Sequence, residues 1–400
     1  MLKKINILAA LLVTLVVYGC GPTSSDSDGS MVMDTATTDI SLAMPNANIP
    51  IFDVSNIARK SFYFAGGDYV GDPLVMGGQM YVEVWEPVNP TQPYPIILFH
   101  GNGQTGVDWL QTPDGRAGWA YYLVEQGYTL YMVDYPARGR SAYLPGGVHG
   151  DLGIRTVEQL ETIWTNVGEK GNFPLAQNHT QWPGTGKMGD PIFDNFIKTQ
   201  VQFAGESTTL ARQATMELID TIGTPVILFT HSQGGGVGWG VADARHELVR
   251  GIVTVEPGGP QIRGVDTATV TYQDREANLY GPVNYPLTYE PPITDPSQLI
   301  TYLEAEADQA GEVPCYLQVE PARQLANMQD MRVLAVSADG TYHRVFDACI
   351  PKWLNQAGVD TDFIRLEDIG ISGNGHMMML ELNSDAIIEF IHGWIQENIT

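Results

Sequence analysis

Residues 224–235 read TPVILFTHSQGG, and the organisation of the whole chain can be worked out from them. The short apolar run after Pro225 is typical of a buried parallel strand. It is followed by a tight turn rich in glycine, with Ser232 at its centre. This layout resembles a nucleophile elbow, whose motif is G-x-S-x-G on a strand-to-helix turn. Thr230 stands where the first glycine is expected, so the match is one residue short.

The glycines that follow Ser232 could instead bind a phosphate. They stand at positions 234, 235, 236, 238 and 240, which fit no G-x-G-x-x-G register, and no lysine follows as in a P-loop. We therefore favour a catalytic hydroxyl over a nucleotide site.

A second apolar strand, predicted over 95–99, ends in His100-Gly101-Asn102-Gly103. This is where an enzyme with such an elbow places its oxyanion loop. The main-chain N–H groups of Asn102 and Gln233 are the candidate oxyanion donors, because such donors must be fixed before negative charge develops.

His376 is the candidate general base. It follows Gly373 and Gly375 closely, after the last predicted strand, in a loop that can reach back over the elbow. Among the other histidines, His100 belongs to the oxyanion loop, His231 points away from its neighbour in an elbow, and His392 lies within the last predicted helix.

The composition predicts a globular protein with a large core. The chain has 400 residues, 44% of them hydrophobic and 17% charged, which allows one large domain or two. Its net charge of -25 argues against nucleic acids and anionic membrane surfaces as partners, because phosphate binding depends on lysine and arginine.

The first 20 residues are typical of a lipoprotein signal peptide. Lys3 and Lys4 precede an apolar stretch over 5–18, and Cys20 ends a lipobox-like VYGC. Cys20 would then carry a lipid, with 21–50 as a flexible tether. The alternatives are ordinary cleavage after Gly19 or a retained short anchor. We expect an exported protein, membrane-anchored in the periplasm or at the cell surface, or else secreted, that touches a membrane only through this lipid.

Cys315 and Cys349 are the other cysteines. In an exported protein they suggest one disulfide, which would contribute roughly 3 to 4 kcal/mol on the chain-entropy model. They could equally be two buried thiols. No spacing of cysteines and histidines indicates a zinc site, so we expect no metal.

Apolar runs alternate with helical stretches along the chain, which favours an α/β fold with a mostly parallel sheet flanked by helices. The predicted strands cover 79–88, 95–99, 129–134, 225–230, 251–255, 332–337 and 362–366. The predicted helices cover about 119–126, 210–222, 345–357 and 385–395.

Two long stretches, about 142–206 and 260–330, interrupt this alternation within the domain predicted over 51–400. Loops of this length usually form a lid or a binding surface, so we expect cap insertions over the strand ends, where open α/β sheets bind ligands. Most aromatic residues of the first insertion are expected to form a small core within the cap: Trp164, Trp182, Phe193, Phe196 and Phe203.

Five segments together resemble the α/β-hydrolases, and within them bacterial serine esterases that carry the triad acid after the sixth strand. They are HGNGQTGVDW at 100–109, TPDGRAGW at 112–119, DYPARGRS at 134–141, VEPG at 255–258 and GNGHMMM at 373–379. The resemblance spans about residues 80–395 and implies an α/β-hydrolase fold.

The resemblance implies a serine carboxylesterase that works through an acyl-enzyme on a small-molecule ester, without a cofactor. Ser232 would be the nucleophile and His376 the base. Glu256, after the strand that follows the elbow, is the favoured acid, and Asp339, after the next strand, is the alternative. Amide, lactone or other acyl bonds remain open as substrates, as does an idle scaffold that serves as a surface binding lipoprotein. The oligomeric state is left open.

Overall fold

An eight-stranded sheet forms the centre of the part of the chain that this computed structural model describes, residues 49–399. Its order is β1-β4-β6-β5-β9-β10-β17-β18. Strand β4 is antiparallel to both neighbours, and all other neighbouring pairs are parallel. The predicted α/β-hydrolase fold is confirmed. The strands are β1 (Ile57–Ala65), β4 (Met80–Pro87), β5 (Ile96–Phe99), β6 (Leu130–Asp134), β9 (Val226–His231), β10 (Val249–Val255), β17 (Arg332–Ser337) and β18 (Asp360–Arg365).

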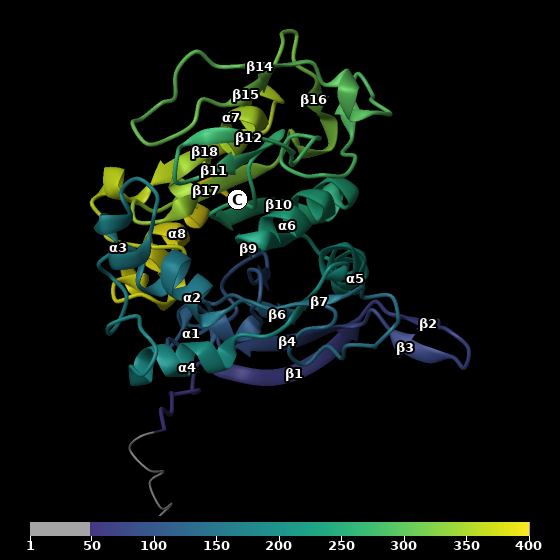
Figure 1. The fold of residues 1–400 in the computed structure, drawn as a ribbon. Coiled ribbons are helices and arrows are strands. Elements are labelled where there is room, and N and C mark those ends of the chain that lie inside the picture. Colours follow the sequence, from purple (N-terminus) through teal and green to yellow (C-terminus); the bar gives the residue numbers. More distant parts are fainter. Residues whose placement is uncertain (1–48, 400) are drawn as a thin grey trace, which may run out of the picture. The chain divides into compact units, whose positions relative to one another are not determined.

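Helices cover both faces of this sheet (Figure 1). In β5, Ile96 and Leu98 face one helical layer, and Ile97 and Phe99 face the other, as the two-residue period of a strand requires. Because both faces are buried, the central strands are mostly apolar. The first layer contains α1 (Trp119–Glu125) and α8 (Ser384–Asn398); the second contains α5 (Ser207–Ile222), α6 (Gln233–Ala244) and α7 (Cys349–Gln356).

Outside the insertions, the clearest differences between the predicted and the observed elements are at β1 and α7. Strand β1 was not predicted, because most of its residues are exposed and it carries no alternating apolar pattern. The helix predicted over 345–357 starts only at Cys349, because residues before it form a 3-10 turn, η7 (Tyr342–Val345), which Thr341 caps.

Short helices form most of the regular structure of the first insertion, which packs into the main core. It contains β7 (Leu152–Gly153), α2 (Val157–Leu160), α3 (Val167–Lys170), α4 (Pro191–Thr199) and β8 (Phe203–Ala204). Trp164, Trp182 and Phe196 belong to the same buried cluster as one face of the sheet. The expected separate core within the cap is therefore wrong for these three side chains.

The second insertion consists of short antiparallel pairs, drawn in green at the top of Figure 1. Strand β11 (Arg263–Asp266) pairs with β12 (Thr271–Glu276), β13 (Tyr289–Glu290) with β16 (Gln324–Leu325), and β14 (Thr301–Leu303) with β15 (Tyr316–Gln318). A disulfide bond joins Cys315, which precedes β15, to Cys349 at the start of α7.

The predicted signal peptide, Cys20 and almost all of the predicted tether lie outside the described residues. The described residues, 49–399, all belong to one compact unit. Within 49–399, no helix has both the length and the apolar character that crossing a membrane requires.

Candidate active site

Ser232 occupies a strained turn between β9 and α6. Its φ of 50° and ψ of -119° lie in a region that side-chain-bearing residues rarely adopt. The Ser232 N–H donates to the Val255 carbonyl at 3.0 Å, which ties the turn to the neighbouring strand. A Cβ on Gly234 would come within 3.0 Å of the Phe99 Cβ, so glycine is needed there for the helix to start so close to β5.

Thr230 stands where the motif expects its first glycine, and the structure gives the reason a larger residue fits. Thr230 is fully buried in β9, and its hydroxyl bonds to that of Thr254 on β10 at 2.9 Å. The side chain therefore lies between two strands and leaves the turn at Ser232 free.

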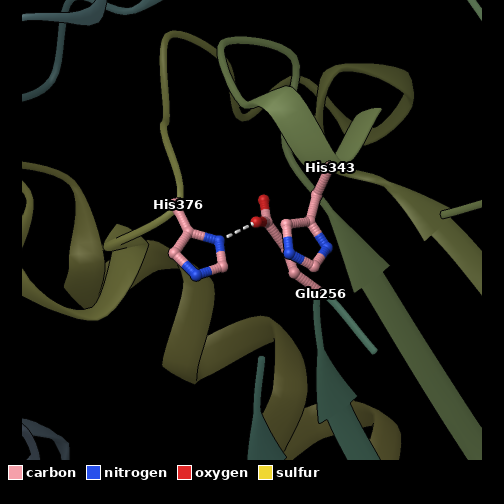
Figure 2. A group of neighbouring side chains, drawn as sticks. All are labelled: Glu256, His343 and His376. Atoms are coloured by element: carbon pink, nitrogen blue, oxygen red, sulfur yellow. Dashed lines mark hydrogen bonds and ion pairs between the residues drawn. The ribbon is translucent and has the colours of Figure 1, made fainter. Parts of the chain in front are cut away.

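Glu256 leaves the sheet at the same edge as Ser232, because Val255 pairs with His231 in the parallel ladder. Its carboxylate is fully buried, and Oε2 accepts hydrogen bonds from His376 Nδ1 and from the Thr341 hydroxyl, the latter at 2.9 Å. Figure 2 shows the Nδ1 of His376 directed at this carboxylate.

Asp339, the alternative acid, has a different partner. Its Oδ1 accepts the N–H of Gly373 at 2.9 Å, at the start of the loop that carries His376. The structure therefore brings Glu256 against the imidazole and places Asp339 beneath the loop.

His376 is buried, and a second hydrogen bond, at its main-chain carbonyl, adds to the one that its ring makes with Glu256. Its carbonyl accepts from His231 Nε2 at 2.9 Å, and its ring stacks on that of Trp164, with centroids 5.7 Å apart. Burial, followed by the neighbouring His231 and His343, holds the pKa of His376 well below 6.5. The imidazole is therefore neutral at pH 7. Its Nδ1 carries the proton and donates it in the hydrogen bond to Glu256, so Nε2 has a free lone pair and can act as a base. Burial raises the pKa of Glu256, and the Thr341 hydrogen bond opposes that shift.

His100 is not available as a base. Its Nδ1 donates to the Gly101 carbonyl at 2.9 Å, and its Nε2 accepts the N–H of Tyr135 at 3.2 Å. Burial, more than the nearby Arg138, lowers the pKa of His100 to about 3. His392 lies in α8 with its Nδ1 3.2 Å from the Tyr128 hydroxyl.

Asn102 and Gln233, the candidate oxyanion residues, lie with Ser232 on the wall of one cavity. Among residues 49–399, neither main-chain N–H has a hydrogen-bond partner, so both can donate to a ligand. Gly101 permits the close approach of the loop, because a Cβ there would lie 2.9 Å from His231 Nδ1.

Arg138 connects the oxyanion loop to the elbow, a role that sequence reasoning did not find. Its side chain is 1% exposed, and it donates to the Gly101 carbonyl at 3.0 Å and to Gln233 Oε1 at 2.7 Å. Arg138 lies in the DYPARGRS segment at 134–141, but its partners Gly101 and Gln233 are far from it along the chain. No local pattern could therefore have identified its role.

The cavity has a volume of about 650 Å³ and opens beside Ser232. Both insertions contribute to its wall, the first through Arg155 and the second through Val265, Arg275 and Tyr285. Tyr342, His343 and Phe346, next to α7, complete it. This volume is in the range of small-molecule sites.

Glu256, His343 and His376 could also hold a metal ion by their chemistry, since donor atoms of the three lie within 4.8 Å of one another (Figure 2). His343 Nδ1 is bonded to Asp347 at 2.9 Å, a pair that the sequence did not signal. A metal bound by all three residues would compete with the hydrogen bond between His376 and Glu256. Metal binding and base catalysis at this cluster therefore exclude each other.

The sheet order and the strained turn between β9 and α6 are those of one protein class, and the chain belongs to the alpha/beta hydrolase family, whose model matches residues 96–390. It is 42% identical over 344 residues to a protein named "Probable secreted lipase phiG" from Fungal sp. (strain ATCC 74256), covering 84% of this chain and 89% of that one. Among solved structures it is similar to that of a novel bacterial esterase, with a TM-score of 0.59 and 20% identity over 88% of this chain and 99% of the other. The structural likeness shows the fold.

Proposed function

We propose that this protein is a serine carboxylesterase with Ser232 as nucleophile, His376 as general base and Glu256 as the acid that orients it. The observation that carries the proposal is the hydrogen bond between His376 Nδ1 and Glu256 Oε2, at the same sheet edge as the strained Ser232.

In the proposed reaction, the Ser232 hydroxyl attacks the ester carbonyl while His376 Nε2 takes its proton. The N–H groups of Asn102 and Gln233 stabilise the oxyanion of the tetrahedral intermediate. His376 then protonates the leaving alcohol, and the acyl group stays on Ser232. Water, deprotonated by His376, hydrolyses this acyl-enzyme and restores the serine.

The names of the two relatives, a lipase and an esterase, favour esters over amides as the substrate class. The word "secreted" in the lipase's name agrees with the export expected from residues 1–20. We therefore infer an exported enzyme, with lipidation at Cys20 as part of the proposal.

The test compares wild type with Ser232→Ala, and with Ser297→Ala as a matched control at an exposed serine of the second insertion. We expect wild type and the control to hydrolyse p-nitrophenyl esters and to be labelled by a fluorophosphonate probe, and Ser232→Ala to do neither. Labelling with turnover of amides or lactones only would change the substrate class. The absence of both labelling and turnover in wild type would favour an idle binding scaffold.

A further inference from the structure

The wall of the cavity differs in charge from the rest of the protein. The chain carries 46 acidic and 21 basic residues. The cavity wall nevertheless contains two arginines, Arg155 and Arg275, and no aspartate or glutamate. A site that accepted only neutral groups would not need a positively charged wall in an acidic protein.

Arg155 is the arginine at the catalytic end. Its Nε donates to Asn102 Oδ1 at 3.1 Å, and its guanidinium carbon lies 5.6 Å from the ring centroid of Trp164, the residue stacked on His376. The side chain is therefore held beside the oxyanion loop. Within residues 49–399, its two terminal nitrogens have no hydrogen-bond partner and no carboxylate. Two donors and a full charge thus remain for a ligand.

Arg275 lies on β12, in the hairpin of the second insertion. Within the described part of the chain, the side chain of Arg275 is hydrogen-bonded only to the neutral Gln273 Oε1, which lies 3.3 Å from both Nε and Nη2. Arg263, on the paired strand β11, instead forms an ion pair with Asp274 at 2.9 Å and does not line the cavity. The hairpin thus neutralises the arginine outside the cavity and leaves the one on its wall without a counter-charge.

Building on the proposed esterase function, we propose that the substrate is an ester bearing an anionic group, such as a carboxylate, which Arg155 binds with Arg275 at the cavity wall. Guanidinium groups bind carboxylates through two parallel hydrogen bonds, and such charge-assisted bonds are about twice as strong as neutral ones. Asn102, whose side chain accepts from Arg155, would place that anionic group close to the oxyanion site.

The test uses two pairs of esters, each with a charged and a neutral member. One pair varies the acyl side: the p-nitrophenyl monoester of succinic acid against p-nitrophenyl butyrate. The other varies the alcohol side: the acetate ester of p-hydroxybenzoate against that of p-hydroxybenzamide. We expect kcat/KM to favour the charged member of at least one pair by about tenfold or more, the effect of one charge-assisted hydrogen bond. Added salt should reduce this ratio.

The variants assign the preference to residues. Arg155→Gln and Arg275→Gln should each reduce the ratio of charged to neutral kcat/KM, and Arg155→Gln should reduce it more. Arg263→Gln removes the same charge from the same hairpin and should leave the ratio unchanged, because Asp274 already neutralises that arginine.

Two results would overturn the proposal and leave the esterase intact: equal or faster turnover of the neutral member in both pairs, or a preference that persists in Arg155→Gln. If no ester is hydrolysed and the fluorophosphonate does not label Ser232, the esterase function itself fails, and the substrate proposal fails with it.

Discussion

His231 Nε2 donates a hydrogen bond of 2.9 Å to the carbonyl oxygen of His376, 145 positions further along the chain. His231 immediately precedes Ser232, so this bond fixes the loop of the proposed base to the elbow of the proposed nucleophile. The backbone of the proposed base is therefore anchored to the end of β9, while its imidazole is held by Glu256 and by the ring of Trp164 in the first insertion.

The two candidate acids give a direct comparison. Glu256→Gln should lower kcat by a factor on the order of 10³ to 10⁴, because an amide can donate to His376 Nδ1 and favour the wrong tautomer. Asp339→Asn keeps an oxygen that can accept from the Gly373 N–H, so its effect should stay below about tenfold. Steady-state kinetics on one ester ranks the two, and the reverse order would move the acid to Asp339.

The strain at Ser232 predicts that activity costs stability at this position. Glycine adopts a φ of 50° with a ψ of -119° far more easily than serine or alanine, so Ser232→Gly should relieve on the order of 1 kcal/mol. Ser232→Ala is the matched control, since it is equally inactive and keeps the strain. Urea unfolding should give the glycine variant the higher free energy of unfolding. Equal values for the two variants would mean that the turn stores no strain.

Buried neutral histidines predict acid sensitivity. Burial lowers the pKa of His100 and of His231 to about 3, whereas both bind protons near pH 6.5 in the unfolded chain. Below pH 6.5 the unfolded state therefore holds more protons, and the free energy of unfolding falls by up to about 1.4 kcal/mol per pH unit for each histidine. Urea unfolding between pH 7 and pH 5, above the range of ordinary carboxylates, measures this slope. A flat profile would show that these histidines are not buried as neutral groups.

The disulfide between Cys315 and Cys349 closes a loop with a sequence separation of 34. Its removal in a double Cys→Ser variant should lower the free energy of unfolding by about 3 to 4 kcal/mol on the chain-entropy model. A reducing agent should destabilise wild type by a similar amount and leave the double variant unaffected. If the reductant shifts both proteins equally, its effect does not come from this bond.

Sequence reasoning located the elements whose signal is local. Strand β17 was predicted with its observed bounds, and β5 and β9 within one residue, because each is a continuous apolar run that ends at glycine or polar residues. The edge strand β1 and the short cap strands lack such a run, since they are largely exposed or only a few residues long.

The polar contacts around the candidate site could not be predicted in the same way. Arg138 meets Gln233 across 95 positions, and Arg155 meets Asn102 across 53. Each pair joins a loop to a distant segment, without any periodicity that would mark the partners. A role for His343 could not be predicted, because its turn, η7, lies in a stretch just before the helix predicted over 345–357, where no motif marks a functional residue.

Both insertions begin after the carboxyl end of a sheet strand, β6 for the first and β10 for the second, and end before α5 and β17. Neither contributes a strand to the central sheet. Mutation and selection can therefore lengthen, shorten or replace these segments without disturbing strand register. Descendants of one ancestral enzyme can then diverge in substrate specificity while they keep the same chemistry.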